Sequence, residues 1–124
     1  MKSVFHHIAI IASSEKSLDF YRLLGFHETF RIHRKHDTIV LMDGNGMQLE
    51  IFIDPNHPLH IDKDEPYGLR HFALKVDGKL EDEIERLRSD STFDLEVGPI
   101  MNDWTGVRFL FIHDPDGLSI EIRE

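Results

Sequence analysis

Two histidines lie in matching segments of the chain, and histidine is the commonest metal ligand in proteins. His7 lies in residues 6–11 (His-His-Ile-Ala-Ile-Ile), and His71 lies in residues 70–75 (Arg-His-Phe-Ala-Leu-Lys). Both segments contain a polar residue followed by histidine, an apolar residue, alanine and a second apolar residue. A repeated pattern indicates duplicated structural units. We therefore interpret the two histidines as equivalent positions of an internal repeat.

Two glutamates form a second matching pair. Glu50 lies near the end of residues 43–51 and Glu121 near the end of residues 114–122, and both segments read D-x-[N/D]-G-[M/L]-x-[L/I]-E-I. Each segment begins with residues typical of a tight turn, in which the glycines take positive φ, and continues as a strand. Each half of the chain therefore supplies one histidine and one glutamate.

The elements that position these residues have the same order in both halves. Leucine and aromatic residues at helical spacing predict a helix over 17–24 in the first half and over 79–89 in the second. Besides the segments that carry the four residues, strands are predicted at 26–33, 38–43, 93–100 and 107–113. Each half then reads β-α-β-β-β, which predicts an α+β fold.

The repeat also predicts the domain organisation. We expect one domain over residues 1–124, with a first module at about 1–54 and a second at about 69–124. The intervening segment, at about 55–68, has three prolines and several charged residues and is interpreted as a connector.

Alternation along the strands places the potential ligands on a face with small or polar neighbours. Around Glu121, for example, Ser119 and Arg123 share the face and apolar residues occupy the opposite one. The apolar face is suited to packing against the helix of its own half, which leaves the other face to line a cleft. The same alternation directs Phe109 and Phe111 toward that cleft, as an apolar wall for a substrate.

Two imidazoles and two carboxylates form a suitable ligand set for one divalent metal ion. The predicted ligands are His7, Glu50, His71 and Glu121. These donors suit nickel, zinc, cobalt, manganese and iron, among which they discriminate poorly. In an octahedral site they leave two positions for water or substrate oxygens.

The remaining histidines have no repeat partner and are predicted to be solvated or to contact a ligand rather than bind the metal. They are His6, His27, His33, His36, His57, His60 and His113. Trp104 lies in a predicted loop, where we expect it to pack the loop down rather than to cover the cleft as a lid.

Composition excludes several other classes of protein. The chain has no cysteine, which removes disulfides, thiolate zinc sites and cysteine nucleophiles. Its 14 basic and 23 acidic residues give a formal charge of −9, which disfavours nucleic acid as a partner. Since no signal peptide and no apolar run of about 20 residues is present, we expect a cytoplasmic protein without a membrane partner.

Several motifs together resemble the vicinal oxygen chelate superfamily, which includes glyoxalase I, extradiol dioxygenases and bleomycin-resistance proteins. They lie at residues 6–11, 20–21 (Phe-Tyr), 24–26 (Leu-Gly-Phe), 69–73 (Leu-Arg-His-Phe-Ala) and 114–122. The resemblance implies a curved mixed sheet built from two β-α-β-β-β modules. It also implies a small-molecule substrate and a homodimer.

The order of ligands in the chain is most similar to that of bacterial glyoxalase I. This resemblance implies a lyase of the lactoylglutathione lyase type, which chelates vicinal oxygens of a small substrate such as a thiol hemithioacetal. Proton transfer through an enediolate would then use Glu121 or Glu50 as the base, and we expect Glu121 to be the more important.

Two classes of alternative remain open. The first is another enzyme of the superfamily, either an extradiol-type dioxygenase or a fosfomycin-type thiol transferase. These enzymes generally ligate with His, His and Glu, whereas Glu50 fills the remaining position here. The second is a bleomycin-resistance-like protein that binds its ligand without a metal.

Overall fold

The computed structural model describes residues 1–58, 68–89 and 94–124, and the side chains of residues 94–97 are not described. The elements in chain order are β1 (His7–Ala12), α1 (Lys16–Leu23), β2 (His27–His33), β3 (Thr38–Gly44), β4 (Met47–Ile53), β5 (Phe72–Lys75), α2 (Leu80–Arg88), β6 (Asp94–Met101), β7 (Arg108–His113) and β8 (Ser119–Arg123). They fall into two compact units, Met1–Leu59 (unit 1) and His60–Glu124 (unit 2).

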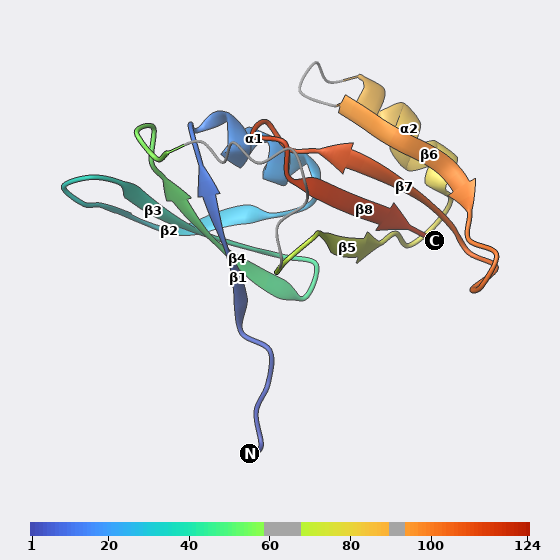
Figure 1. Ribbon diagram of the computed structural model, residues 1–124, viewed down its shortest axis with the longest axis horizontal. Helices are drawn as coiled ribbons and strands as arrows, with labels where there is room; N and C mark the ends of the chain where they lie inside the picture. The colour runs from blue at the N-terminus through green and yellow to red at the C-terminus, as the bar shows by residue number, and fades with distance from the viewer. Residues whose placement is uncertain (59–67, 90–93) are drawn as a thin grey trace. The chain divides into compact units, whose positions relative to one another are not determined.

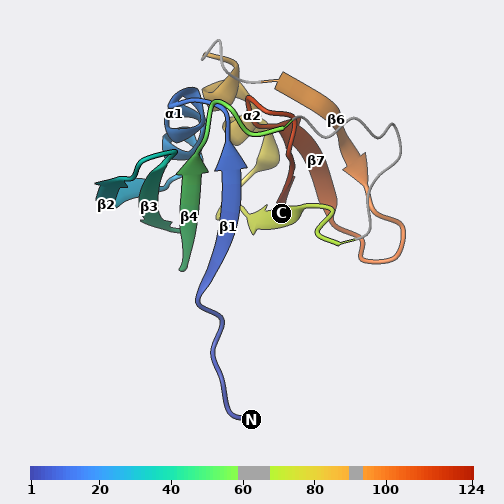
Figure 2. The ribbon, with the colours of Figure 1, turned by 60° about the vertical axis from the view of Figure 1, so that its left-hand side comes forward.

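Each unit contains one four-stranded mixed sheet, and the two sheets have the same topology. The strand order is β1-β4-β3-β2 in unit 1 and β5-β8-β7-β6 in unit 2. The first strand of each unit pairs in parallel with the last, and the other pairs are antiparallel. Figures 1 and 2 show both sheets curved, each with one helix. The predicted α+β fold with two β-α-β-β-β modules is confirmed.

Alternating burial along the strands creates the core of each unit. In β4 the residues Leu49, Ile51 and Ile53 are buried, whereas the residues between them are half-buried. In β8 the residues Ile120 and Ile122 are buried in the same alternating pattern. The buried face is the apolar face predicted from the sequence, so Glu50 and Glu121 belong to the opposite face of their sheets.

The helices contribute apolar stripes to these cores and end within one residue of the predicted positions. In α2, Leu80, Ile84 and Leu87 are buried, as their helical spacing requires. Helix α1 ends in a Schellman motif: Gly25 has φ 93°, and its N–H donates to the carbonyl of Arg22 at 3.0 Å. A glycine is favoured there because a side chain is strained at positive φ.

The two hairpin turns that precede the glutamates have the predicted turn chemistry. Between β3 and β4, Asn45 and Gly46 both have positive φ, at 53° and 72°, which is the geometry of a type I′ turn. Between β7 and β8, the buried Asp114 accepts hydrogen bonds through Oδ1 from the N–H groups of Asp116 and Leu118, at 2.9 and 2.8 Å. These turns fix the register of the strands that carry Glu50 and Glu121.

Two details differ from the sequence-based predictions. Element ends shift by one or two residues, so that His71 lies immediately before β5 rather than inside it. Trp104 is 97% exposed, and the prediction that it packs its loop down is wrong. The loop is instead held by Asn102, whose Oδ1 accepts hydrogen bonds from the N–H groups of Trp104 and Thr105. Most of the predicted connector, 59–67, lies outside the described residues.

A search for membrane-crossing helices among the described residues found none that is long and apolar enough.

Candidate metal centre

In unit 1, the two predicted ligands contact each other directly. His7 Nε2 lies 3.0 Å from Glu50 Oε2, and the two side chains are 37% and 24% exposed. The parallel pairing of β1 with β4 places Ala9 opposite Glu50, so that a small side chain adjoins the carboxylate. The register therefore brings together two residues that are far apart in the sequence.

The other ring nitrogen of His7 contacts the preceding residue, His6. His6 Nδ1 lies 2.7 Å from His7 Nδ1, and the two rings meet edge to face. His6 is thus one of the histidines predicted to contact a ligand rather than to bind the metal. It restrains the imidazole of His7 from the side opposite Glu50.

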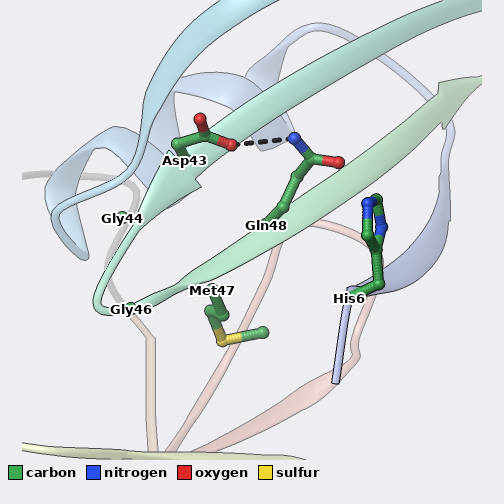
Figure 3. A pocket seen from close by; sticks show the side chains of 6 residues that line it. All are labelled: His6, Asp43, Gly44, Gly46, Met47 and Gln48. Atoms are coloured by element: carbon green, nitrogen blue, oxygen red, sulfur yellow. Dashed lines mark hydrogen bonds between the residues drawn. The ribbon is translucent and has the colours of Figure 1, made fainter. Parts of the chain in front are cut away.

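A shallow depression of about 430 Å³ lies beside this pair in unit 1. It is lined by His6, Asp43, Gly44, Gly46, Met47 and Gln48. In Figure 3, the amide of Gln48 points toward Asp43, to whose Oδ1 it donates a hydrogen bond of 3.0 Å. Since Gln48 is the strand partner of His7, this hollow adjoins the histidine.

In unit 2, the equivalent pair has the same geometry. His71 Nε2 lies 3.0 Å from Glu121 Oε2, and the side chains are 24% and 18% exposed. Ala73 lies opposite Glu121 in the register, as Ala9 lies opposite Glu50 in unit 1. The second pair is the more buried of the two.

Aromatic rings and a cation surround His71. The ring of Phe111 meets that of His71 edge to face at 5.0 Å and that of Phe109 at 5.8 Å. Leu110 and Ile112 are buried on the opposite face, so the two phenylalanines lie on the face of Glu121, as predicted. Arg70 donates from Nη1 to His71 Nδ1 at 3.0 Å, and its guanidinium lies 5.7 Å from the Phe111 centroid.

The spacing within each pair suits metal coordination. Two adjacent ligands of an octahedral ion, each with a bond of about 2.1 Å, have donor atoms about 3.0 Å apart. That is the distance between nitrogen and oxygen in both pairs. Within residues 1–58, 68–89 and 94–124, no group of three or more ligand-type side chains is found. Each pair therefore brings two potential donor atoms together. The binding of one ion by all four residues remains a prediction.

Two of the remaining described histidines make contacts away from the two pairs. His57 lies 3.3 Å from Asp54, and His33 lies 3.0 Å from the hydroxyl of Thr38. His60 lies outside the described residues. His6 and Arg70 occupy the same position of the repeat, immediately before the histidine of each pair, and both contact its Nδ1. This shared position in the repeat is the feature of the sequence from which their contact with the two histidines could have been predicted.

Comparisons with known proteins agree with this duplicated architecture. The model of the glyoxalase/bleomycin resistance protein/dioxygenase superfamily matches residues 4–122. The uncharacterized protein YwkD of Bacillus subtilis is 39% identical over an alignment covering 100% of this chain and 98% of YwkD.

Solved structures show the same fold. A glyoxalase family protein from Enterococcus faecalis is 34% identical with a TM-score of 0.84, covering 98% of this chain and 97% of that one. A lactoylglutathione lyase from Agrobacterium tumefaciens is 22% identical with a TM-score of 0.69, covering 99% and 94%. The family model and the relatives above 30% identity lead to one conclusion. This chain belongs to the glyoxalase/bleomycin resistance protein/dioxygenase superfamily.

Proposed function

We propose that this protein is a metal-dependent, glyoxalase I-like enzyme that moves a proton between adjacent carbons of a small substrate with vicinal oxygens. The observation that carries the proposal is the duplicated histidine–glutamate pair, which has the same atoms at 3.0 Å in both units. In both pairs it is Nε2 that faces the carboxylate, while Nδ1 is contacted from the other side by His6 or Arg70, which fixes the orientation of each imidazole.

In this proposal one divalent ion is held by both pairs. Its ligands are His7, Glu50, His71 and Glu121. When bound, such an ion acidifies the carbon–hydrogen bond beside the chelated oxygens and stabilises the negative charge that develops there. The two imidazoles and two carboxylates supply neutral and anionic donors, which suits nickel, zinc, cobalt, manganese or iron.

The glutamates also supply the base. A carboxylate close to the acidified carbon takes the proton and returns it to the neighbouring carbon. We assign this role to Glu121 rather than to Glu50, because its side chain is the less exposed, at 18% against 24%, and its strand partner is the aromatic Phe111. Phe109 and Phe111 form the apolar surface beside Glu121 and limit the access of water to it.

The activity is tested with the metal-loaded protein. The hemithioacetals of methylglyoxal with glutathione and with other thiols are the substrates, and nickel, zinc, cobalt, manganese and iron are compared. We expect isomerisation with at least one metal, and a loss of about 100-fold or more in Glu121→Gln that still binds the metal. Metal binding without isomerase activity would refute the proposed reaction but would remain consistent with the proposed metal site. Undiminished turnover in Glu121→Gln would remove Glu121 as the base.

We further propose that residues 1–124 act as one domain in a cytoplasmic homodimer. The two pairs then meet either within one chain or between two chains. Mixing His7→Ala with His71→Ala distinguishes these arrangements, because in an exchanged dimer one of the two sites would regain all its ligands. Recovery of nickel binding on mixing indicates sharing between chains, and no recovery indicates a site within one chain.

A further inference from the structure

Two cations lie side by side on the face of sheet β5-β8-β7-β6 that carries Glu121. Lys75 and Arg123 are direct partners in the parallel pairing of β5 with β8. The neighbouring residues Leu74 and Ile122 are buried on the opposite face, so both cations belong to the face of Glu121. Strand alternation places Arg123 two residues from Glu121, about 7 Å along the strand.

This arrangement costs stability in the free protein. Like charges directly opposite each other on neighbouring strands repel. Among the residues that the structure describes, no carboxylate forms an ion pair with Lys75 or Arg123. The acidic chain, with its formal charge of −9, offers many carboxylates that could have neutralised them. An anion bound between the two side chains would remove the repulsion.

The internal repeat shows that cations are not required by the fold at these positions. The repeat aligns Lys75 with Ile11 and Arg123 with Phe52, and those two residues are also strand partners, between β1 and β4. The same row is therefore apolar in unit 1 and cationic in unit 2. Since the two sheets share one topology, the difference points to a ligand rather than to packing.

We propose that Lys75 and Arg123 bind an anionic group of the substrate, a carboxylate or a phosphate. This proposal rests on the proposed function, which places the chelated end of the substrate at Glu121. The partner of Arg123 on the next strand is Phe109, which continues the row as an apolar surface. The substrate class is thus a molecule with vicinal oxygens at one end and an acidic group at the other.

The test compares two acids that chelate identically and differ only at the far end. 2-Oxoglutarate carries a second carboxylate there, and 2-oxopentanoate carries a methyl group. Their dissociation constants are measured by calorimetry on the nickel-loaded protein. We expect 2-oxoglutarate to bind about 5- to 10-fold more tightly, as two charge pairs near the surface would provide, one to the exposed Lys75 and one to the half-buried Arg123. In Lys75→Gln and Arg123→Gln the preference should fall to about twofold or less.

A matched control separates local recognition from general charge. Arg88→Gln removes the same charge from the exposed end of α2, and it should keep the full preference. Thermal melts of Lys75→Gln and Arg123→Gln should show midpoints equal to or slightly above that of the unmodified protein, because the repulsion is relieved. Equal binding of both acids by the unmodified protein, or a preference that survives both substitutions, would overturn the proposal.

A second measurement keeps this proposal separate from the metal-dependent function. If the protein binds no nickel, the function proposed above fails, and the metal-free protein is titrated with inorganic phosphate while backbone amide chemical shifts are followed. Saturable shifts centred on Lys75 and Arg123, absent in Arg123→Gln, would support the anion site by itself. No shifts at these residues would overturn it.

Discussion

The aromatic contacts of Phe111 predict that stability and metal affinity respond differently to two similar substitutions. Phe111 meets both His71 and Phe109 edge to face, at 5.0 and 5.8 Å. Ring contacts of this kind contribute about 0.5–1.5 kcal/mol each, so Phe111→Leu, which loses both, should destabilise the protein by about 1–3 kcal/mol. Leucine is compatible with the position, because Leu41 occupies the equivalent place opposite Glu50 in unit 1.

Phe109→Leu is the matched control, since it removes the contact between the rings of Phe109 and Phe111 but leaves the contact between Phe111 and His71. It should destabilise the protein by about 0.5–1.5 kcal/mol. Denaturant unfolding measures both stabilities, and calorimetric nickel titration measures affinity. We expect Phe111→Leu to weaken nickel binding by about 3- to 10-fold, because His71 loses the ring that restrains it. Equal effects of the two substitutions on nickel affinity would refute this reasoning.

Two further predictions concern the fold around the site. Alanine at Gly44 would place its Cβ inside van der Waals contact of the backbone at Gly25, so Gly44→Ala should destabilise by about 1–3 kcal/mol in urea unfolding; unchanged stability would contradict that close approach. In unit 2, the Arg108 guanidinium hydrogen-bonds Glu81 and Glu124 and holds both carboxyl pKa values below normal, that of Glu81 at about 2. Because these pKa values are lower in the folded state, their stabilisation is present above about pH 4.5 and is lost as the pH falls toward about 2. The difference in melting temperature between the unmodified protein and Arg108→Gln should therefore shrink over that range, and a constant difference would contradict the assignment.

The repeat in the sequence made most of the fold predictable. Alternating burial, two matching turns and two helical stripes each depend on local residue patterns, which is why both β-α-β-β-β modules were predicted with ends accurate to one or two residues. The order of strands within each sheet follows from the fold that the motifs resemble, because local patterns do not specify which strands pair.

The pairing of ligands within each unit was also predictable, since strand alternation places His7 and Glu50 on one kind of face. The residues that contact these two pairs were less predictable from the sequence. Contacts of His6 and Arg70 with the rings of His7 and His71 depend on side-chain directions at the ends of strands, where alternation breaks down. The exposure of Trp104 likewise depends on how Asn102 caps its loop, which residue type alone does not determine.

Nickel stoichiometry in single-histidine variants tests the central claim most directly. If the pairs of both units serve one ion, the unmodified protein binds one nickel per chain, and His7→Ala and His71→Ala each lose tight binding by themselves. Circular dichroism of the metal-free variants confirms that they are folded. Two nickel ions per chain, or one that remains tightly bound in either variant, would show that the pairs act separately and would contradict the shared site.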